Sequence, residues 1–145
     1  MIKRVVATVC ISAAIVSAAA TQAKKPAGAK SVMHELTVTA DLVYTGTMEL
    51  AVDGGKVTGN MHVTSPAEIT GKVAGTFRAG VLNLEFPFLM VQENCAGTVK
   101  MTIKMPARPG PAAGTMEAVG GCSGEANDKV TGTVELKPAA PKNPK

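Results

Sequence analysis

A polar–apolar alternation with a period of two is the feature of this chain that most limits its fold. The stretches Lys56–Val63 (KVTGNMHV) and Lys129–Leu136 (KVTGTVEL) have nearly the same sequence. In both, polar residues alternate with Val, Gly, Met or Leu. Because successive side chains of a β-strand point to opposite faces, each octet predicts a strand with one polar and one apolar face.

The same pattern recurs along the chain. Lys72–Arg78 and Thr98–Met105 alternate in this way, and a unit of Gly, then Thr or Asn, then an apolar residue occurs six times. The Gly of this unit lies on the apolar face, where it indicates a bend, a bulge or a close backbone approach. Repeated bending on one face favours a sheet that coils round on itself.

Turn motifs separate the alternating stretches. The sequence Asp53-Gly54-Gly55 is a strong hairpin motif. Further breaks rich in Gly, Pro or Asn lie at residues 65–67, 78–80, 92–94, 106–113 and 124–129. These breaks leave strands of about 7–9 residues and predict an all-β fold, an antiparallel up-and-down meander of about seven or eight strands. Such a meander forms a small barrel or a flattened sandwich.

The N-terminal residues 1–23 have the composition of a secretory signal peptide. Lys3 and Arg4 precede the uncharged run Val5–Ala20, and small residues follow it. The run has 16 residues, fewer than the roughly 20 that a membrane-spanning helix needs. We therefore expect cleavage after Ala23 and a mature protein located in the periplasm or secreted.

After cleavage, we expect a flexible basic tail over residues 24–32, a single domain over 33–137 and a disordered Pro- and Lys-rich tail over 138–145. The basic residues collect in the tails, because residues 32–136 contain 7 Lys or Arg and 11 Asp or Glu. Nucleic-acid binding needs a basic face with stacking aromatic residues. The acidic domain, with one Tyr, three Phe and no Trp, argues against a nucleic-acid partner.

Cleavage leaves two cysteines, Cys95 and Cys122, because Cys10 lies within the leader. Cysteines of exported proteins usually pair in their oxidising compartment. We therefore predict one Cys95–Cys122 disulfide, which in chain-entropy terms stabilises the domain by about 3–4 kcal/mol.

An outer-membrane barrel is the main alternative architecture. Such barrels have an apolar outer face, aromatic girdles at both interfaces and strands of about 9–11 residues. The few aromatic residues and the shorter predicted strands argue against it, so we expect no membrane span after cleavage. Lipocalin- and avidin-type barrels have a similar architecture, but they open with a Gly-x-Trp strand and this chain has no Trp. No family is assigned on this basis.

No catalytic residues emerge from the sequence. The chain has two histidines, His34 and His62, and none of its serines lies in a G-x-S-x-G motif. The acidic residues are spread singly over predicted turns and polar faces, so no acid–base pair stands out. We therefore expect a protein without enzymatic activity and without a cofactor.

Metal binding has only weak support. Cys95 and Cys122 lack the short spacing to each other or to a histidine that structural zinc sites show. The adjacent pairs Met33-His34 and Met61-His62 offer thioether and imidazole groups, which suit copper(I). The alternation separates the two members of such a pair onto opposite faces, so we assign no metal site and keep periplasmic copper handling as a further alternative.

The predicted interior is apolar and has few large aromatic side chains, which indicates a loosely filled barrel able to hold one small apolar ligand. The candidate lining residues are Met48, Met61, Phe77, Leu84, Phe86, Met101, Met105 and Met116. The most apolar window, Leu84–Val91, contains Pro87, which cannot donate to a strand ladder and indicates an edge strand or a bulge. Its candidate partner-binding rim consists of Phe86, Phe88, Leu89 and Met90.

Besides copper handling, the sequence supports two classes of function. The leading hypothesis is an exported, non-enzymatic small β-barrel that binds an apolar small molecule or an envelope component. The alternative is a structural or protein-interaction module with a filled core, which acts through its outer face or through the Phe86–Val91 rim.

Overall fold

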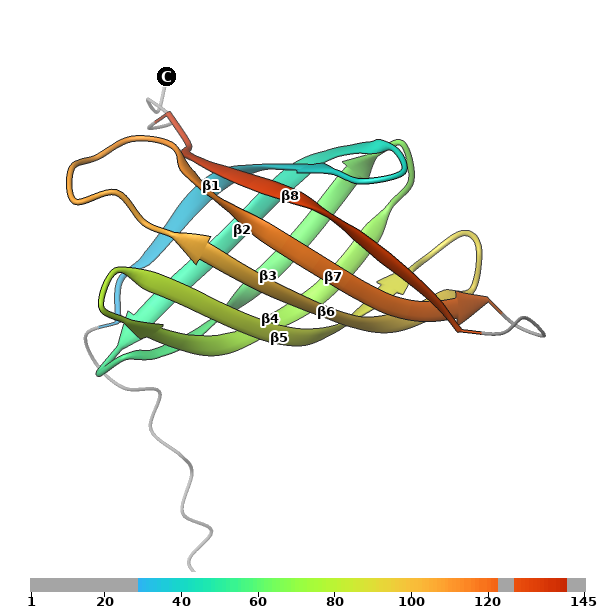
Figure 1. The fold of residues 1–145 in the computed structure, drawn as a ribbon, viewed down its shortest axis with the longest axis horizontal. Coiled ribbons are helices and arrows are strands. Elements are labelled where there is room, and N and C mark those ends of the chain that lie inside the picture. The colour runs from blue at the N-terminus through green and yellow to red at the C-terminus, as the bar shows by residue number, and fades with distance from the viewer. Residues whose placement is uncertain (1–28, 123–126, 141–145) are drawn as a thin grey trace, which may run out of the picture.

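The computed structural model describes residues 29–122 and 127–140. Its eight antiparallel strands form a meander, and β1 pairs with β8 to close a barrel (Figure 1). The strands are β1 (Ser31–Thr39), β2 (Val43–Asp53), β3 (Lys56–Ser65), β4 (Ile69–Arg78), β5 (Val81–Met90), β6 (Cys95–Lys104), β7 (Ala112–Cys122) and β8 (Asp128–Pro138). The predicted all-β meander is confirmed, and it forms a barrel. The predicted leader (1–23) and parts of both predicted tails lie outside the described residues.

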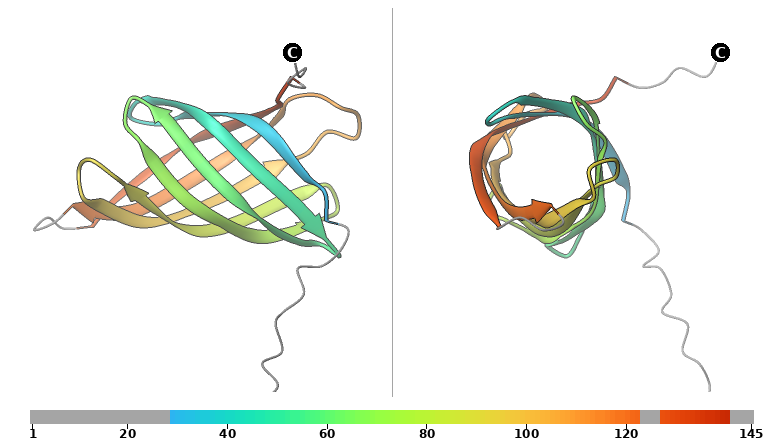
Figure 2. Two further views of the ribbon diagram at one scale, coloured as in Figure 1. Left: turned by 180° about the vertical axis from the view of Figure 1, so that it is seen from behind. Right: turned by 90° about the vertical axis from the view of Figure 1, so that its right-hand side faces the viewer.

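Closure brings the first and last strands together in register. Leu36 lies opposite Leu136, and Val38 lies opposite Val134. All four residues are at most 4% exposed, because their side chains point into the barrel. Seen from one end, the strands form a continuous ring (Figure 2, right). A closed ring leaves no edge strand open for pairing with another chain.

The two octets of similar sequence are strands β3 and β8. Val57 and Met61 of β3, and Val134 and Leu136 of β8, are buried, whereas the polar residues that alternate with them lie on the outer wall. In an antiparallel meander, strands with odd and even numbers run in opposite directions along the barrel. The same octet can thus form a strand of the barrel in either direction, because the alternation of inner and outer faces does not depend on chain direction.

The glycines of the octets allow neighbouring strands to approach closely. A Cβ atom at Gly59 would meet the backbone carbonyl oxygen of Glu49, and one at Gly132 would meet that of Thr39. Both oxygens belong to adjacent strands or their connections. The sequence indicates a bend, a bulge or a close backbone approach at these glycines, and the structure shows the close backbone approach.

The core lies inside the barrel, and polar side chains cover its outer wall. Of the 17 residues in the buried apolar cluster, Phe86, Met48 and Met101 are among the largest. Their side chains fill the interior, so the barrel is packed rather than loosely filled where these residues lie. Along β6, every outward residue from Ala96 to Lys104 is exposed, and these include two Thr and two Lys. A lipid-facing barrel has the opposite arrangement.

No helix within residues 29–122 and 127–140 is long and apolar enough to span a membrane.

Two local predictions differ from the structure. The strands have 9–11 residues rather than about 7–9, because strands of a barrel are tilted and run directly into short turns. Strand β5 is not an edge strand, since it pairs with both β4 and β6. The β4–β5 ladder is instead interrupted between the pairs Gly71–Phe88 and Gly75–Leu84, opposite Pro87, which has no N–H to donate.

The two ends of the barrel differ. At the turn end, to the left in Figure 1, residues Gly54–Gly55 join β2 to β3 and Ala79–Gly80 join β4 to β5. All four residues have positive φ, as two-residue hairpin turns require. The opposite end, called the mouth below, carries the β1–β2, β3–β4 and β5–β6 connections. These connections have three or four residues each, whereas the β6–β7 connection at the turn end, residues 105–111, has seven.

Candidate ligand pocket at the mouth of the barrel

A pocket of about 460 Å³ opens at the mouth. Its apolar walls include Tyr44, Phe88, Met90, Met116, Ala118 and Val130. Tyr44, Phe88, Met116 and Ala118 also pack against the buried cluster, so the core forms the floor of the pocket. The volume lies within the roughly 300–1,000 Å³ that small-molecule sites usually have.

Small inward side chains of β7 help to leave space at the mouth of the barrel. Ala118 and Gly120 occupy inward positions of β7 near the mouth. At the turn end, Phe77, Leu82 and Met105 occupy the interior and belong to the core or pack against it. Small residues leave space at one end that large residues fill at the other.

Phe88 forms one wall of the pocket, and two glycines of the neighbouring strands lie beside its ring. A Cβ atom at Gly97 would lie 2.8 Å from the Cε1 atom of Phe88, and one at Gly120 would lie 3.0 Å from its Cζ atom. A Cβ atom would lie closer still to a backbone carbonyl oxygen, that of Val119 at Gly97 and that of Ala96 at Gly120, so close approach of β6 and β7 also requires these glycines. The ring thus lies close to the backbone of β6 and β7.

The polar groups of the pocket are acidic or phenolic. The Tyr44 hydroxyl donates a hydrogen bond to Oδ1 of Asp41, at 3.1 Å, and Glu93 and Asp128 also line the pocket. The pKa of Tyr44 is raised above its usual value of 10.0, chiefly by burial and further by the hydrogen bond and by the charges of Asp41 and Glu93. The described lining contains no Ser, Thr, His, Lys or Arg.

The predicted disulfide is confirmed and lies in the pocket wall. Cys95 and Cys122 are directly opposite each other on β6 and β7, with a Cα–Cα distance of 4.0 Å. Both residues line the pocket, and Cys95 is buried. The disulfide therefore adds a covalent link to the β6–β7 ladder at the mouth.

The structure places only one of the eight candidate lining residues in this pocket. Met48, Met61, Leu84, Phe86 and Met101 are at most 5% exposed and belong to the core. Phe77 and Met105 are partly buried at the turn end. Met116 is the one that lines the pocket.

The candidate partner rim is divided between three environments. Phe86 is in the core, Phe88 and Met90 line the pocket, and Leu89 lies on the outer wall with 46% of its surface exposed. The alternation of faces along β5 separates these neighbours. A single partner surface made of all four side chains is therefore not present.

Sequence reasoning missed Asp41, Tyr44, Glu93, Asp128 and Val130 as pocket residues. In an up-and-down barrel, alternate connections lie at the same end, so the residues around the β1–β2, β5–β6 and β7–β8 connections meet there. The predicted meander contained this information. Applying it to the turn residues would have placed the three carboxylates together.

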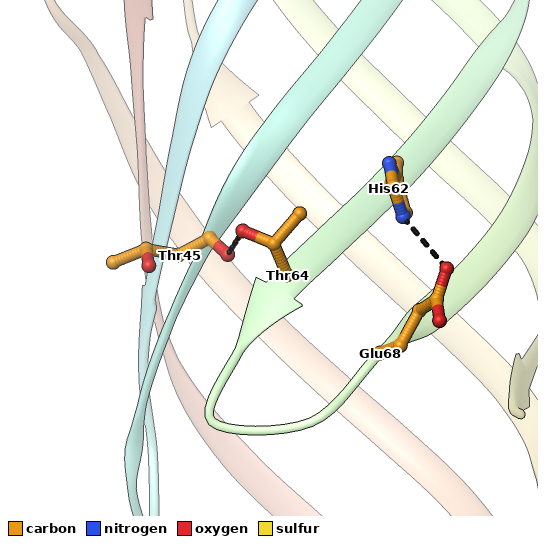
Figure 3. Close-up of polar contacts among 4 residues, drawn as sticks. All are labelled: Thr45, His62, Thr64 and Glu68. Carbon is orange, nitrogen blue, oxygen red and sulfur yellow. Dashed lines mark hydrogen bonds and ion pairs between the residues drawn. The ribbon is translucent and has the colours of Figure 1, made fainter. Parts of the chain in front are cut away.

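The two Met–His pairs are split between faces. Met61 points inward, whereas the side chain of His62 is 50% exposed and its Nε2 atom lies 3.1 Å from Oε1 of Glu68 (Figure 3). His34 is buried with no hydrogen-bond partner for its Nδ1 atom, whereas Met33 is exposed. Within residues 29–122 and 127–140, no three His, Cys, Asp or Glu side chains lie close enough to hold a metal ion.

A β-bulge interrupts the ladder between β2 and β3 near His62. The register of β2 and β3 shifts between Thr45 and Gly46, and the hydroxyl of Thr64 donates to the carbonyl oxygen of Thr45 at 3.3 Å (Figure 3). A bulge increases the local twist of the strands. It lies at the mouth end of β3.

Comparisons of the chain with protein-family models, with curated proteins and with solved structures find no significant match.

Proposed function

We propose that the protein is an exported, non-enzymatic barrel that binds one small apolar molecule in the mouth pocket. The observation that carries this proposal is an apolar-walled pocket of about 460 Å³ seated on a packed core. Ligand sites usually combine such walls with a few polar groups that orient the ligand, and here Tyr44 and Asp41 are two such groups.

One further feature supports binding rather than catalysis. Two others support export rather than retention in the cytoplasm. The described pocket lining lacks the Ser, His or Lys side chains that would form a nucleophile and its base. Residues 1–23 have the pattern of a secretory leader, and a disulfide suits an oxidising compartment. We place the mature protein in the periplasm or outside the cell.

The methionines provide a direct test. In a sample labelled with ¹³C at the methionine methyl groups, n-decanol should shift the NMR signals of Met90 and Met116 in a saturable manner. The signals of Met48 and Met101 should move little, because these residues are buried in the core. If no methionine signal responds up to the solubility limit of n-decanol, the proposal is wrong.

A matched pair of variants strengthens the test. Ala118→Phe fills the pocket and should abolish the shift of Met116, whereas Ala113→Phe adds the same side chain on the exposed face of the same strand. If Ala118→Phe binds n-decanol as well as Ala113→Phe does, the ligand does not occupy this pocket.

A second candidate function is docking of a partner at the mouth. Five of the exposed large apolar residues lie near this end, and we call them the collar: Leu42, Val43, Leu89, Val91 and Val119. Apolar side chains gathered on one part of a surface are typical of interaction sites. Leu89→Lys should abolish partner binding and leave the thermal midpoint unchanged, and normal binding of partners by this variant would contradict the idea.

A further inference from the structure

The carboxylates at the mouth give the pocket a charge. Asp41 lies in the β1–β2 connection, Glu93 in the β5–β6 connection and Asp128 at the start of β8. All three line the pocket, and no basic residue does so in the described part of the chain. The pocket therefore combines apolar walls with a negative rim.

Three acids of the outer wall form ion pairs with lysines, whereas the carboxylates at the mouth, like Glu35 and Glu49 of the outer wall, form none with described side chains. Within the described residues, Glu85 pairs with Lys100, Glu117 with Lys129 and Glu135 with Lys137. No described Lys, Arg or His lies within ion-pair distance of Asp41, Glu93 or Asp128. The negative charge at the mouth is thus not neutralised by the described side chains around it.

The negative charges at the mouth act on the phenol of Tyr44. Its pKa is raised chiefly by burial, and the charges of Asp41 and Glu93 raise it further. Both carboxylates thus act on one point of the pocket wall, although they belong to different connections. A positive group placed near Tyr44 would be attracted by the same charges.

We propose that the natural ligand is a cationic amphiphile, with an apolar body in the pocket and an amine or quaternary ammonium group at the rim between Asp41, Glu93 and Asp128. This inference rests on the proposed function and adds the chemical class of the ligand. The aromatic rings of Tyr44 and Phe88 suit such a guest, since aromatic side chains commonly surround quaternary ammonium groups.

Three probes with the same apolar body and different head groups test this class: decyltrimethylammonium, n-decanol and decanoate, each below its micellar concentration. Tyr44 is the only Tyr of the chain, and the chain has no Trp, so its fluorescence reports binding at the pocket. At low salt, decyltrimethylammonium should bind about 3–10-fold more tightly than n-decanol, because the three carboxylates are exposed and each contributes modestly. Decanoate should bind most weakly, and added salt should reduce these differences.

Two triple variants with equal changes in net charge provide the control. Asp41→Asn, Glu93→Gln and Asp128→Asn together should abolish the preference for the cation. Glu85→Gln, Glu117→Gln and Glu135→Gln together should preserve it, because these acids lie on the outer wall. If the first variant does not fold, the salt dependence of probe binding to the unmodified protein is the test. A preference for the cation that does not fall with added salt would contradict the proposal.

The phenol of Tyr44 offers a second readout. Bound decyltrimethylammonium should lower the pKa of Tyr44, because a nearby positive charge favours the phenolate. Bound n-decanol should not lower it.

The outcomes separate this inference from the proposed function. If n-decanol or decanoate binds as tightly as the cation, the ligand class is wrong while the pocket remains a binding site. If none of the three probes changes Tyr44 fluorescence or the Met90 and Met116 signals, the proposed function is wrong as well.

Discussion

The hydroxyl of Tyr44 donates a hydrogen bond to Oδ1 of Asp41 across a distance of 3.1 Å, at the entrance of the pocket. Burial, and further this bond and the charges of Asp41 and Glu93, raise the pKa of Tyr44 above 10.0. Because the folded protein holds the phenol proton more tightly than the unfolded chain does, Tyr44 contributes stability that is fully present below pH 10. That contribution is lost as the pH rises from there through the pKa of the folded state.

Asp41→Asn should therefore lower the pKa of Tyr44 toward 10.0 and reduce this alkaline loss of stability. Phenolate absorbance during a pH titration measures the pKa of Tyr44 directly, because the chain has no other Tyr. Asp53→Asn, at the turn end, removes the same charge far from Tyr44 and should leave the titration unchanged. An equal effect of the two variants would mean that net charge, and not the hydrogen bond, sets the pKa.

Removal of the disulfide should destabilise the barrel. The cysteines are 27 positions apart, and a loop of this size corresponds to about 3 kcal/mol, or a fall in the thermal midpoint by about 10 °C. The double variant Cys95→Ser, Cys122→Ser avoids an unpaired thiol. Dithiothreitol should lower the midpoint of the unmodified protein to that of the variant and should not affect the variant. Equal midpoints for variant and unmodified protein under oxidising conditions would contradict the prediction.

Gly59→Ala should destabilise the barrel strongly. The new Cβ atom would collide with the carbonyl oxygen of Glu49 on β2, and overpacking of this kind costs about 1–3 kcal/mol or more. Denaturant unfolding measures the loss. Gly110→Ala is the control, because it lies in the β6–β7 connection, where the nearest atom to a new Cβ is 3.9 Å away. Similar losses in both variants would show that close strand approach is not the reason for Gly59.

Ala79→Asn should stabilise the protein by about 0.5–1 kcal/mol. Ala79 has a φ of 49° in the two-residue turn between β4 and β5, and Asn tolerates this conformation better than Ala. With Gly80 it would form the Asn-Gly pair that such hairpins favour. Ala74→Asn, on the exposed face of β4, should give no gain. A lower unfolding free energy for Ala79→Asn would contradict the prediction.

Local features of the sequence were sufficient to predict most of the strands. The alternation in Lys56–Val63 and in Lys129–Leu136 assigns the inner and outer faces of β3 and β8 correctly, since the direction of a side chain in a strand depends only on its parity. The Gly54–Gly55 turn was predictable for a similar reason, because positive φ favours Gly. The pairing of Cys95 with Cys122 followed from there being only two cysteines outside the predicted leader.

Tertiary structure alone decided where the barrel is filled and where it is open. Met48 and Met116 have the same side chain and both follow a Gly-Thr pair, yet Met48 is fully buried and Met116 lines the pocket. Their burial differs because the two side chains lie at different positions along the barrel axis and face different residues across the closed barrel. Pairing of β1 with β8 joins residues far apart in the chain. Neither the gathering of Asp41, Glu93 and Asp128 nor the space beside Tyr44 is therefore encoded in any single stretch of sequence.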